Sequence, residues 1–342
     1  MHGRHRNGKI KFGGIMVEMR TIESRRLFRE AKLAERRGDI KATAEFNRQG
    51  LLLDSRASQA DWDLLEESPR LFRERRALYA LLSIRVEDMA RAVYAESKLA
   101  KAAPTVQPHT FMYWGQGFDS APPIVQACYA QAVRLHDHDE IIFLDNNNLH
   151  DWVTLPPAVM EISQSKRAAF SDVLRFELLA KYGGIWMDAT CLPTRRLHDA
   201  YPDMVRSSGF YAFGKGKPGL ISSWFLASEA GNYITCMTRD ALRLYFGVYD
   251  QPIMYFFLHQ MFMYLHRLDE RFGKLWDKST VLPVDPRALN RALLKEVSDV
   301  DLSSLIAGSF VHKLTHKHNS EIVTASSVQQ VLIDRFTARA SH

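Results

Sequence analysis

One stretch of the chain combines acidic and basic side chains with two glycines in a pattern that could do chemistry. Asp172 and Arg175 lie one helical turn apart, and Asp188 follows a short apolar run. Gly183 and Gly184 stand between them and suit a helix end that needs positive φ. A helix, a glycine turn and a strand would deliver one carboxylate to a strand end, where ligand sites of open α/β sheets gather. The sequence therefore predicts that Asp172, Arg175 and Asp188 face one crevice.

The elements around these residues follow from hydrophobic periodicity. Three leucines share one stripe of a predicted helix: Leu174, Leu178 and Leu179. This helix either is capped by Ser171 or begins earlier, near Lys166. Residues 185–187 are apolar and too few for anything but a buried strand. An acid and a base three residues apart also form ordinary solvated ion pairs, so spacing alone leaves that interpretation open.

Several blocks of the chain stand in an order that resembles a known family. They are Ser171-Asp172 with Arg175, Tyr182-Gly183-Gly184-Ile185-Trp186, Asp188-Ala189-Thr190, Tyr113-Trp114-Gly115-Gln116-Gly117, Pro122-Pro123 with Cys128, Ser223-Trp224-Phe225-Leu226-Ala227 and His312-Lys313-Leu314-Thr315-His316-Lys317. This pattern resembles the capsular polysaccharide synthesis glycosyltransferases, which are similar to the wider group of GT-A transferases with a DXD motif. The resemblance covers roughly residues 109–320. It implies a GT-A type nucleotide-sugar-binding α/β/α sandwich with an N-terminal α-helical appendage.

The resemblance also implies an activity. It indicates a hexosyltransferase that moves a sugar from a nucleotide-diphosphate donor, a UDP-sugar first of all, onto a glycan or lipid-linked glycan acceptor of a bacterial capsule or surface polysaccharide. It implies retention of anomeric configuration. No further carboxylate stands out as nucleophile or base, so a front-face and a covalent mechanism both stay open. The alternative function is a non-catalytic GT-A-like scaffold or binding protein of a polysaccharide-assembly complex.

The family pattern assigns roles to individual residues. The implied catalytic residues are Asp172, Arg175, Asp188 and Lys313. Asp172 would bind donor hydroxyls, Arg175 would lie against sugar or phosphate, and Asp188 would hold a metal or the donor ribose. Lys313, with His312 or His316, would stabilise charge on the departing diphosphate. Donor binding is expected of the same two aspartates, Arg175 and Lys313, and of Trp114, Gly115, Gln116, Gly117, Gly184, Thr190, Trp224, His312 and Lys317, with Trp224 on the acceptor side.

A divalent cation is the expected cofactor, although the motif is incomplete. Thr190 stands where the second aspartate of the DXD motif is usual, so Asp188 is the one carboxylate. Mn²⁺ or Mg²⁺ is often held by one or two carboxylates plus substrate phosphates. The expected protein ligands are Asp188, His312 and His316.

The catalytic region begins with a predicted strand, loop, helix and strand. Residues 110–114 form the first strand and run into a glycine loop, and residues 123–135 have helical spacing. Residues 140–145 form a second buried strand that ends in three asparagines. This order predicts an α/β fold. Asp145 and the asparagines either contact a nucleotide or simply form the turn.

Composition predicts two units in an enzyme of 342 residues with 46% apolar content. Residues 1–104 are expected to be basic and helical, with residues 1–15 disordered, and residues 105–342 to be the GT-A-like domain. Residues 1–100 contain 21 Lys and Arg against 15 Asp and Glu, whereas residues 101–342 contain 24 of each. The basic region either touches a membrane or a polysaccharide-assembly partner or is merely solvated. Nucleic acid is not an expected partner.

Other features predict the compartment and exclude some chemistry. No early apolar run resembles a signal peptide, and residues 252–265 are too short to span a bilayer and read as a buried helix. The expected location is the cytoplasm, including the inner face of its membrane. Cys128, Cys191 and Cys236 lack paired spacing and are expected to be reduced core thiols, with a reactive Cys191 the weaker alternative. Residues 136–139, His-Asp-His-Asp, are expected to be a surface loop rather than a metal site.

Overall fold

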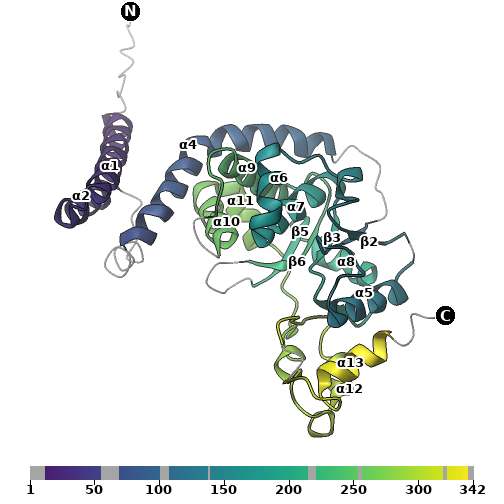
Figure 1. The fold of residues 1–342 in the computed structure, drawn as a ribbon. Coiled ribbons are helices and arrows are strands. Elements are labelled where there is room, and N and C mark those ends of the chain that lie inside the picture. The colour runs from purple at the N-terminus through teal and green to yellow at the C-terminus, as the bar shows by residue number, and fades with distance from the viewer. Residues whose placement is uncertain are drawn as a thin grey trace, which may run out of the picture. The chain divides into compact units, whose positions relative to one another are not determined.

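The chain divides into two compact units, residues 1–84 and 85–342. The computed structural model describes residues 12–54, 69–100, 108–137, 139–214, 221–252, 256–318 and 322–337 (Figure 1). Helix α4 (Pro69–Ala100) continues across the division. The domain boundary predicted at residue 104 falls outside the described residues. Residues 1–11 of the segment expected to be disordered also fall outside them, and α1 begins at Phe12.

The first unit contains a helical hairpin, within the region expected to be helical. Helices α1 (Phe12–Arg36) and α2 (Ile40–Leu53) pack together and bury Leu27, Ala31 and Ala34. Asp39 begins α2 by accepting a hydrogen bond from the Ala42 backbone N–H at 3.0 Å. The helix pair therefore has an apolar seam of its own.

The second unit is built on a mixed sheet of strand order β2-β1-β3-β6-β5. The strands are β1 (Thr110–Tyr113), β2 (Ile141–Leu144), β3 (Gly184–Met187), β5 (Phe210–Phe213) and β6 (Ser222–Ser228). Strand β1 is parallel to β2 and β3, whereas β6 is antiparallel to both β3 and β5. The carboxyl ends of β1, β2 and β3 therefore meet the start of β6 at one edge of the sheet.

Helices cover this sheet and extend it. Helix α7 packs on β3 and β6, α6 and α9 pack on α7, and α10 and α11 pack on α9 (Figure 1). Helix α8 packs on β5 and β6, while α5 contacts both α13 and a two-stranded ribbon of β4 and β7. The bounds are α5 (Pro123–Leu135), η1 (Leu149–Asp151), α6 (Pro157–Ser165), α7 (Arg167–Tyr182), β4 (Cys191–Pro193), α8 (Leu197–Val205), α9 (Tyr233–Phe246), α10 (Phe257–Leu268), α11 (Glu270–Asp277), η2 (Asn290–Ala292), η3 (Val297–Asp299), α12 (Leu302–Ala307), β7 (Val311–Lys313) and α13 (Val328–Thr337).

The turn from α7 into β3 depends on two glycines. Gly183 ends α7 with φ of +67°, and Gly184 has φ of +88°. A Cβ on Gly184 would lie 2.2 Å from the His109 carbonyl oxygen, so only glycine allows β3 to approach β1 this closely. Ser171 lies inside α7 and does not cap it; the alternative start near Lys166 is confirmed.

The predicted α/β class is confirmed. The expected strand, helix and strand over residues 110–145 form β1, α5 and β2, and residues 257–265 form part of the buried helix α10. Within the described ranges, no helix has the length and apolar character needed to cross a membrane.

Candidate functional site

A cavity of about 770 Å³ lies at the edge where β1, β3 and β6 meet. Its volume falls in the range of small-molecule sites. The ends of these strands, one side of α7 and the segment after β7 line it. The pairing of β4 with β7 brings that last segment to the cavity from more than a hundred residues away.

Asp188 and Lys313 form the centre of the cavity. The Lys313 Nζ lies 2.9 Å from Asp188 Oδ2 and donates to Thr190 Oγ1 at 2.6 Å. The other Asp188 oxygen accepts from the indole N–H of Trp186 at 3.0 Å. Burial raises the pKa of Asp188, but the charges of Lys313 and Arg175 outweigh it and leave that pKa below its usual value. Asp188 is therefore held ionised.

Arg175 joins the two aspartates. It is buried, with Nη1 2.8 Å from Asp172 Oδ1 and Nη2 3.5 Å from Asp188 Oδ1. Its guanidinium also donates to the Ser223 carbonyl at 2.9 Å and to Ser171 Oγ at 2.9 Å. This pair is buried and bound to further groups, so the interpretation as a solvated ion pair is wrong.

The second carboxyl of the site titrates at an unusual pH. Burial raises the pKa of Asp172 to about 6, against the lowering effect of Arg175. The two aspartates thus differ, because Lys313 faces Asp188 and not Asp172. Environments that separate the pKa values of two carboxyls are typical of functional sites.

The β1 end of the cavity is lined by aromatic and amide side chains. Trp114, Gly115 and Gln116 line it, and the Tyr113 hydroxyl donates to Asn146 Oδ1 at 2.7 Å. With its oxygen toward α7, the Gln116 amide accepts from the Arg167 guanidinium. These groups offer flat rings and hydrogen bonds at one end of the cavity.

The loop after β2 resolves one of the open alternatives. Asp145 Oδ1 accepts from the backbone N–H of Asn147 at 2.7 Å and of Asn148 at 3.1 Å. Asp145 is therefore a turn former, as are those two asparagines. Asn146 is the exception, because it lines the cavity.

Other predicted residues are placed both in and out of the cavity. Trp224, His316 and Lys317 line it with Thr190. Gly117 and Gly184 are not among its described lining residues. Both have positive φ, so their role is to allow the backbone conformation at their positions.

His312 is a correction to the predicted site. It is buried next to Lys313 in β7, and its Nε2 lies 3.0 Å from the Ile306 carbonyl oxygen. Successive residues of a strand point to opposite faces, so His312 and Lys313 do not face the same space. His312 is absent from the described lining of the cavity and belongs to the packing behind it.

Among the residues that line the cavity and that the sequence did not single out are Arg167, His259, Arg287 and Asn290. Arg167 had a signal, because it precedes Ser171 by four residues and Arg175 by eight, which places all three on one face of α7. The other three come from distant segments and carry no local signal. Burial and the charge of Arg175 lower the pKa of His259, which favours its neutral form.

The cavity is arranged to receive an anion with hydrogen-bonding groups. Its described lining carries two carboxylates and five cationic side chains: Arg167, Arg175, Arg287, Lys313 and Lys317. Four lining residues also bear a buried polar atom with no partner among the described residues: Trp114 Nε1, Trp224 Nε1, His259 Nδ1 and Asn290 Oδ1. Buried polar atoms are rarely left unpaired, so a ligand or ordered water in the cavity is the expected partner of these groups.

The donor set does not fit a metal ion held by the protein. Both Asp188 oxygens already accept from donors, Trp186 and Lys313. His316 packs edge-on against Trp114, with ring centroids 5.2 Å apart. In the part of the chain that the structure describes, no group of three or more His, Cys, Asp or Glu is positioned to hold a metal. The cation expected from the sequence stays a prediction.

The three cysteines are free and buried, as expected. Burial raises the pKa of Cys191 to about 12, which keeps it a thiol and argues against reactivity. His136 is buried instead of lying in a surface loop, and its Nε2 accepts from the Leu197 backbone N–H at 2.8 Å. Its role is to start α8.

Comparison with known proteins gives one match. A family model described as capsular polysaccharide synthesis protein matches residues 68–332. This span contains the whole described lining of the cavity. No curated protein and no solved structure matches the chain.

Proposed function

The chain belongs to the capsular polysaccharide synthesis protein family, and from this premise we propose that it is a glycosyltransferase of capsule or surface-glycan synthesis. The proposed donor is a sugar linked to a nucleoside diphosphate, with UDP-sugars first, and the acceptor is a glycan or lipid-linked glycan. The observation that carries the proposal is the cluster of Asp188, Lys313, Arg175 and Asp172 in a cavity rich in cations.

We assign the nucleotide to the β1 end of the cavity. Trp114 offers a ring and an indole N–H without a partner among the described residues, and Asn146 and Gln116 offer amides. In a parallel sheet, nucleotides bind at the carboxyl ends of the strands, which is where these residues lie. The relation to GT-A enzymes is part of this proposal.

We assign the diphosphate to the cationic side. Lys313 is fixed by Asp188 and Thr190, so its ammonium is held in place before a ligand arrives. Arg287 and Lys317 stand in the same lining and add two charges. Lysine acts as a point charge on phosphate, whereas arginine can donate two parallel hydrogen bonds.

The reaction follows from these assignments. The bond from the anomeric carbon to the diphosphate oxygen breaks, its electron pair stays on that oxygen, and the acceptor hydroxyl oxygen bonds to the carbon. The proton of that hydroxyl leaves with the diphosphate. Negative charge grows on the leaving oxygen, and preorganised cations such as Lys313 stabilise it. We propose that Asp172 and Arg175 bind the transferred sugar and that the anomeric configuration is retained, with no step that needs a protein-held metal.

We place the reaction in the cytoplasm, at the inner face of the membrane. The support is the charge distribution, because residues 1–84 hold 18 Lys and Arg against 12 Asp and Glu, whereas residues 85–342 hold 27 of each. A basic unit can bind anionic lipid headgroups next to the acceptor.

The test is release of nucleoside diphosphate from a panel of UDP-, GDP- and ADP-sugars by the wild type and by Asp188→Asn. We expect one donor to be hydrolysed slowly without acceptor and the variant to lose this activity, because it loses the charge that fixes Lys313. Asp250→Asn, an exposed aspartate outside the described cavity lining, is the control and should match the wild type.

Two results would contradict the proposal. Equal turnover by Asp188→Asn and the wild type would remove Asp188 from the site. If no donor is turned over, calorimetry with UDP, GDP and ADP follows, and an absence of binding to all three would favour a non-catalytic scaffold.

A further inference from the structure

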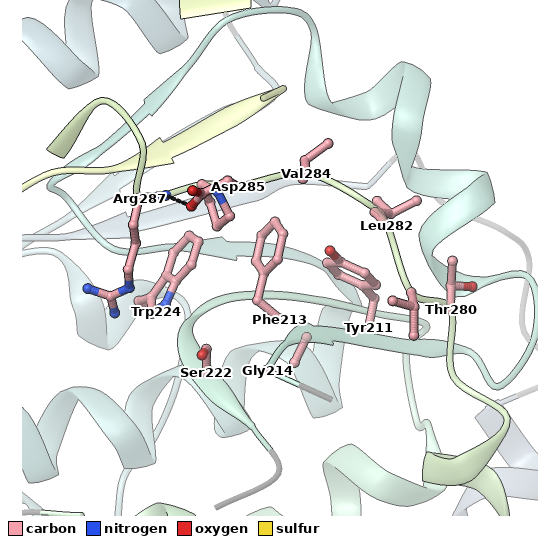
Figure 2. Close-up of a pocket in the computed structure, with 13 residues that line it drawn as sticks. Tyr211, Phe213, Gly214, Ser222, Trp224, Thr280, Leu282, Val284, Asp285 and Arg287 are labelled. Atoms are coloured by element: carbon pink, nitrogen blue, oxygen red, sulfur yellow. Dashed lines mark hydrogen bonds between the residues drawn. The ribbon is translucent and has the colours of Figure 1, made fainter. Parts of the chain in front are cut away.

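The structure contains a second, smaller cavity of about 180 Å³, whose lining is drawn in Figure 2. We call it the side slot. Its walls are β5 with the start of β6 on one side and residues 280–287 on the other. Ser222, Trp224 and Arg287 line both cavities, so the side slot and the main cavity are neighbours with a shared wall.

One wall of the side slot is a row of aromatic rings. Trp224 and Phe213 stack with centroids 4.9 Å apart at 11°, and Tyr211 meets Phe213 edge-on at 5.3 Å. Figure 2 shows the three rings side by side, with residues 280–287 running past their edges. Phe213 covers one face of Trp224 and the Arg287 Cζ lies 6.0 Å from its centroid, so Trp224 offers an edge to a ligand and not an open face.

The side slot also carries polar groups, and one of them lacks a partner among the described residues. Trp224 is only 7% exposed, and its Nε1–H has no acceptor among the described residues. Tyr211 lines the same slot, and its hydroxyl adds a second polar group to the wall. A buried donor of this kind needs a partner, and the two cavities it borders are where a ligand oxygen could supply one.

The opposite wall is apolar with one charge pair at its end. Leu282 and Val284 are half-buried and pack against the core, and Asp285 accepts from the Arg287 backbone N–H at 3.0 Å. Asp285 is also paired with Arg291. The side slot therefore combines apolar edges, hydroxyl and N–H groups, and balanced charge.

We propose that the side slot binds one uncharged sugar ring of the acceptor glycan, next to the unit that receives the transferred sugar. This inference rests on the proposed function. A sugar ring has apolar C–H surfaces and hydroxyl edges, which match the aromatic edges, the unpaired Trp224 N–H and the Tyr211 hydroxyl. The volume is below the range of independent small-molecule sites and excludes a nucleoside diphosphate, whereas it suits one ring of a longer ligand.

Continuity gives the direction of the acceptor chain. Because Trp224 and Arg287 line both cavities, a glycan seated in the side slot continues past them into the main cavity. The next sugar unit then lies close to Asp188, whose backbone N–H donates to the Trp224 carbonyl at 2.9 Å. The side slot would thus select acceptors by the unit behind the reacting one.

The experiment uses saturation-transfer NMR on the full chain with neutral disaccharides as probes: maltose, cellobiose, lactose and chitobiose. Val284→Phe should fill the side slot. It should weaken, by at least tenfold, the affinity for whichever disaccharide the wild type binds. Tyr211→Phe removes only a hydroxyl and should weaken it several-fold. Val248→Phe adds the same ring at an exposed position outside both cavities and should leave binding unchanged.

Affinity for UDP, GDP and ADP is measured in parallel and separates the two proposals. Disaccharide binding that is lost only in the side-slot variants supports the inference. This holds even if no nucleotide binds and the proposed glycosyltransferase function is thereby contradicted. Disaccharide signals that are absent from the wild type, or equal in Val284→Phe, overturn it whatever the nucleotide result. Geranyl phosphate is the probe for a lipid tail. If it gives a signal that Val284→Phe abolishes, and no disaccharide gives a signal, the side slot binds a lipid tail and the inference is overturned.

Discussion

Lys313 places a positive charge directly on Asp188, the carboxylate from which a metal ligand was expected. Its ammonium lies between Asp188 and Thr190, where it supplies positive charge without an ion. We expect Lys313→Ala to lower kcat for the donor by about 10² to 10³, because the fixed ammonium that we propose to stabilise the leaving oxygen is lost. Lys317→Ala should cost less, since that lysine is exposed at the cavity rim.

The metal dependence of the same assay tests the charge assignment. Nucleoside diphosphate release by the wild type should be equal in EDTA, Mg²⁺ and Mn²⁺, and Mn²⁺ should not rescue Lys313→Ala. A strict requirement for Mn²⁺ or Mg²⁺ would instead establish the divalent cation expected from the sequence, with Lys313 displaced from Asp188 when the donor binds.

Asp172 should set the pH dependence of the reaction. Its pKa is raised to about 6 by burial, so the carboxylate is protonated as the pH falls through 6 and no longer accepts the hydrogen bonds that we propose it receives from sugar hydroxyls. We expect kcat/KM for the donor to decline below about pH 6, and Asp172→Asn to be slow and to lack this decline. His259→Gln is the control, because His259 also titrates below its usual pKa; a decline that disappears in this variant would assign it to the histidine.

The same raised pKa has the opposite effect on stability. Because folded Asp172 binds a proton more tightly than the unfolded chain does, it contributes most to stability below its ordinary pKa of 3.8. That contribution is lost as the pH rises from there through about 6. Above about pH 6, Asp172 is therefore ionised, as the proposed function requires, but no longer contributes to the stability of the fold.

Sequence spacing identified the centre of the site but not its rim. Asp172, Arg175 and Asp188 come from one helix, turn and strand, so their juxtaposition follows from local structure. Lys313 was found through family resemblance, since nothing local connects residues 188 and 313. The prediction that His312 acts in the site together with Lys313 was wrong. Side chains alternate along a strand, so His312 faces away from the side of β7 on which Lys313 lies.

At the scale of elements, the α7–β3 turn fixes where Asp188 emerges. Gly184→Ala would bring a Cβ to 2.2 Å from the His109 carbonyl oxygen and demand φ of +88° from alanine. The combined cost of strain and overlap is about 3 kcal/mol or more. We expect Tm to fall by roughly 6–12 °C and nucleotide affinity to fall with it, because β3 must shift.

Gly247→Ala is the matched control for this substitution. Gly247 ends α9 with an ordinary φ of −74°, and a Cβ there would meet the Arg243 carbonyl oxygen at 3.2 Å. Its Tm should stay within about 2 °C of the wild type. A Gly184→Ala variant as stable as Gly247→Ala would show that the β1–β3 contact is looser than the structure indicates.

Local periodicity predicts elements better than it predicts their pairing. The helix expected over residues 123–135 matches α5, because its core spacing is contained in one segment. The antiparallel insertion of β6 beside β3 and the β4–β7 ribbon join segments far apart in the chain. Such pairings depend on the whole core, so Arg287 and the side slot were not predictable from spacing.

At the scale of the whole molecule, the two units differ in net charge. The second unit is formally neutral, so the excess of six positive charges lies in residues 1–84. Three exposed basic residues of α1 recur at helical spacing: Arg29, Lys32 and Arg36. Leu33, beside them in the sequence, is 39% exposed. Basic helices with an apolar neighbour suit an anionic lipid surface.

The double variant Arg29→Glu, Lys32→Glu should therefore lose binding to vesicles that contain phosphatidylglycerol. Each basic side chain near an anionic surface contributes about 1 kcal/mol, so reversing two should weaken sedimentation with vesicles at least tenfold, and added salt should weaken the wild type likewise. Lys278→Glu, Lys295→Glu makes the same change of net charge at exposed positions of the second unit and should keep wild-type binding. If both double variants bind equally, net charge alone governs adsorption and the first unit has no lipid-directed role. If neither the variants nor salt alters binding, the attraction is not electrostatic, and the exposed leucine of α1 becomes the element to replace.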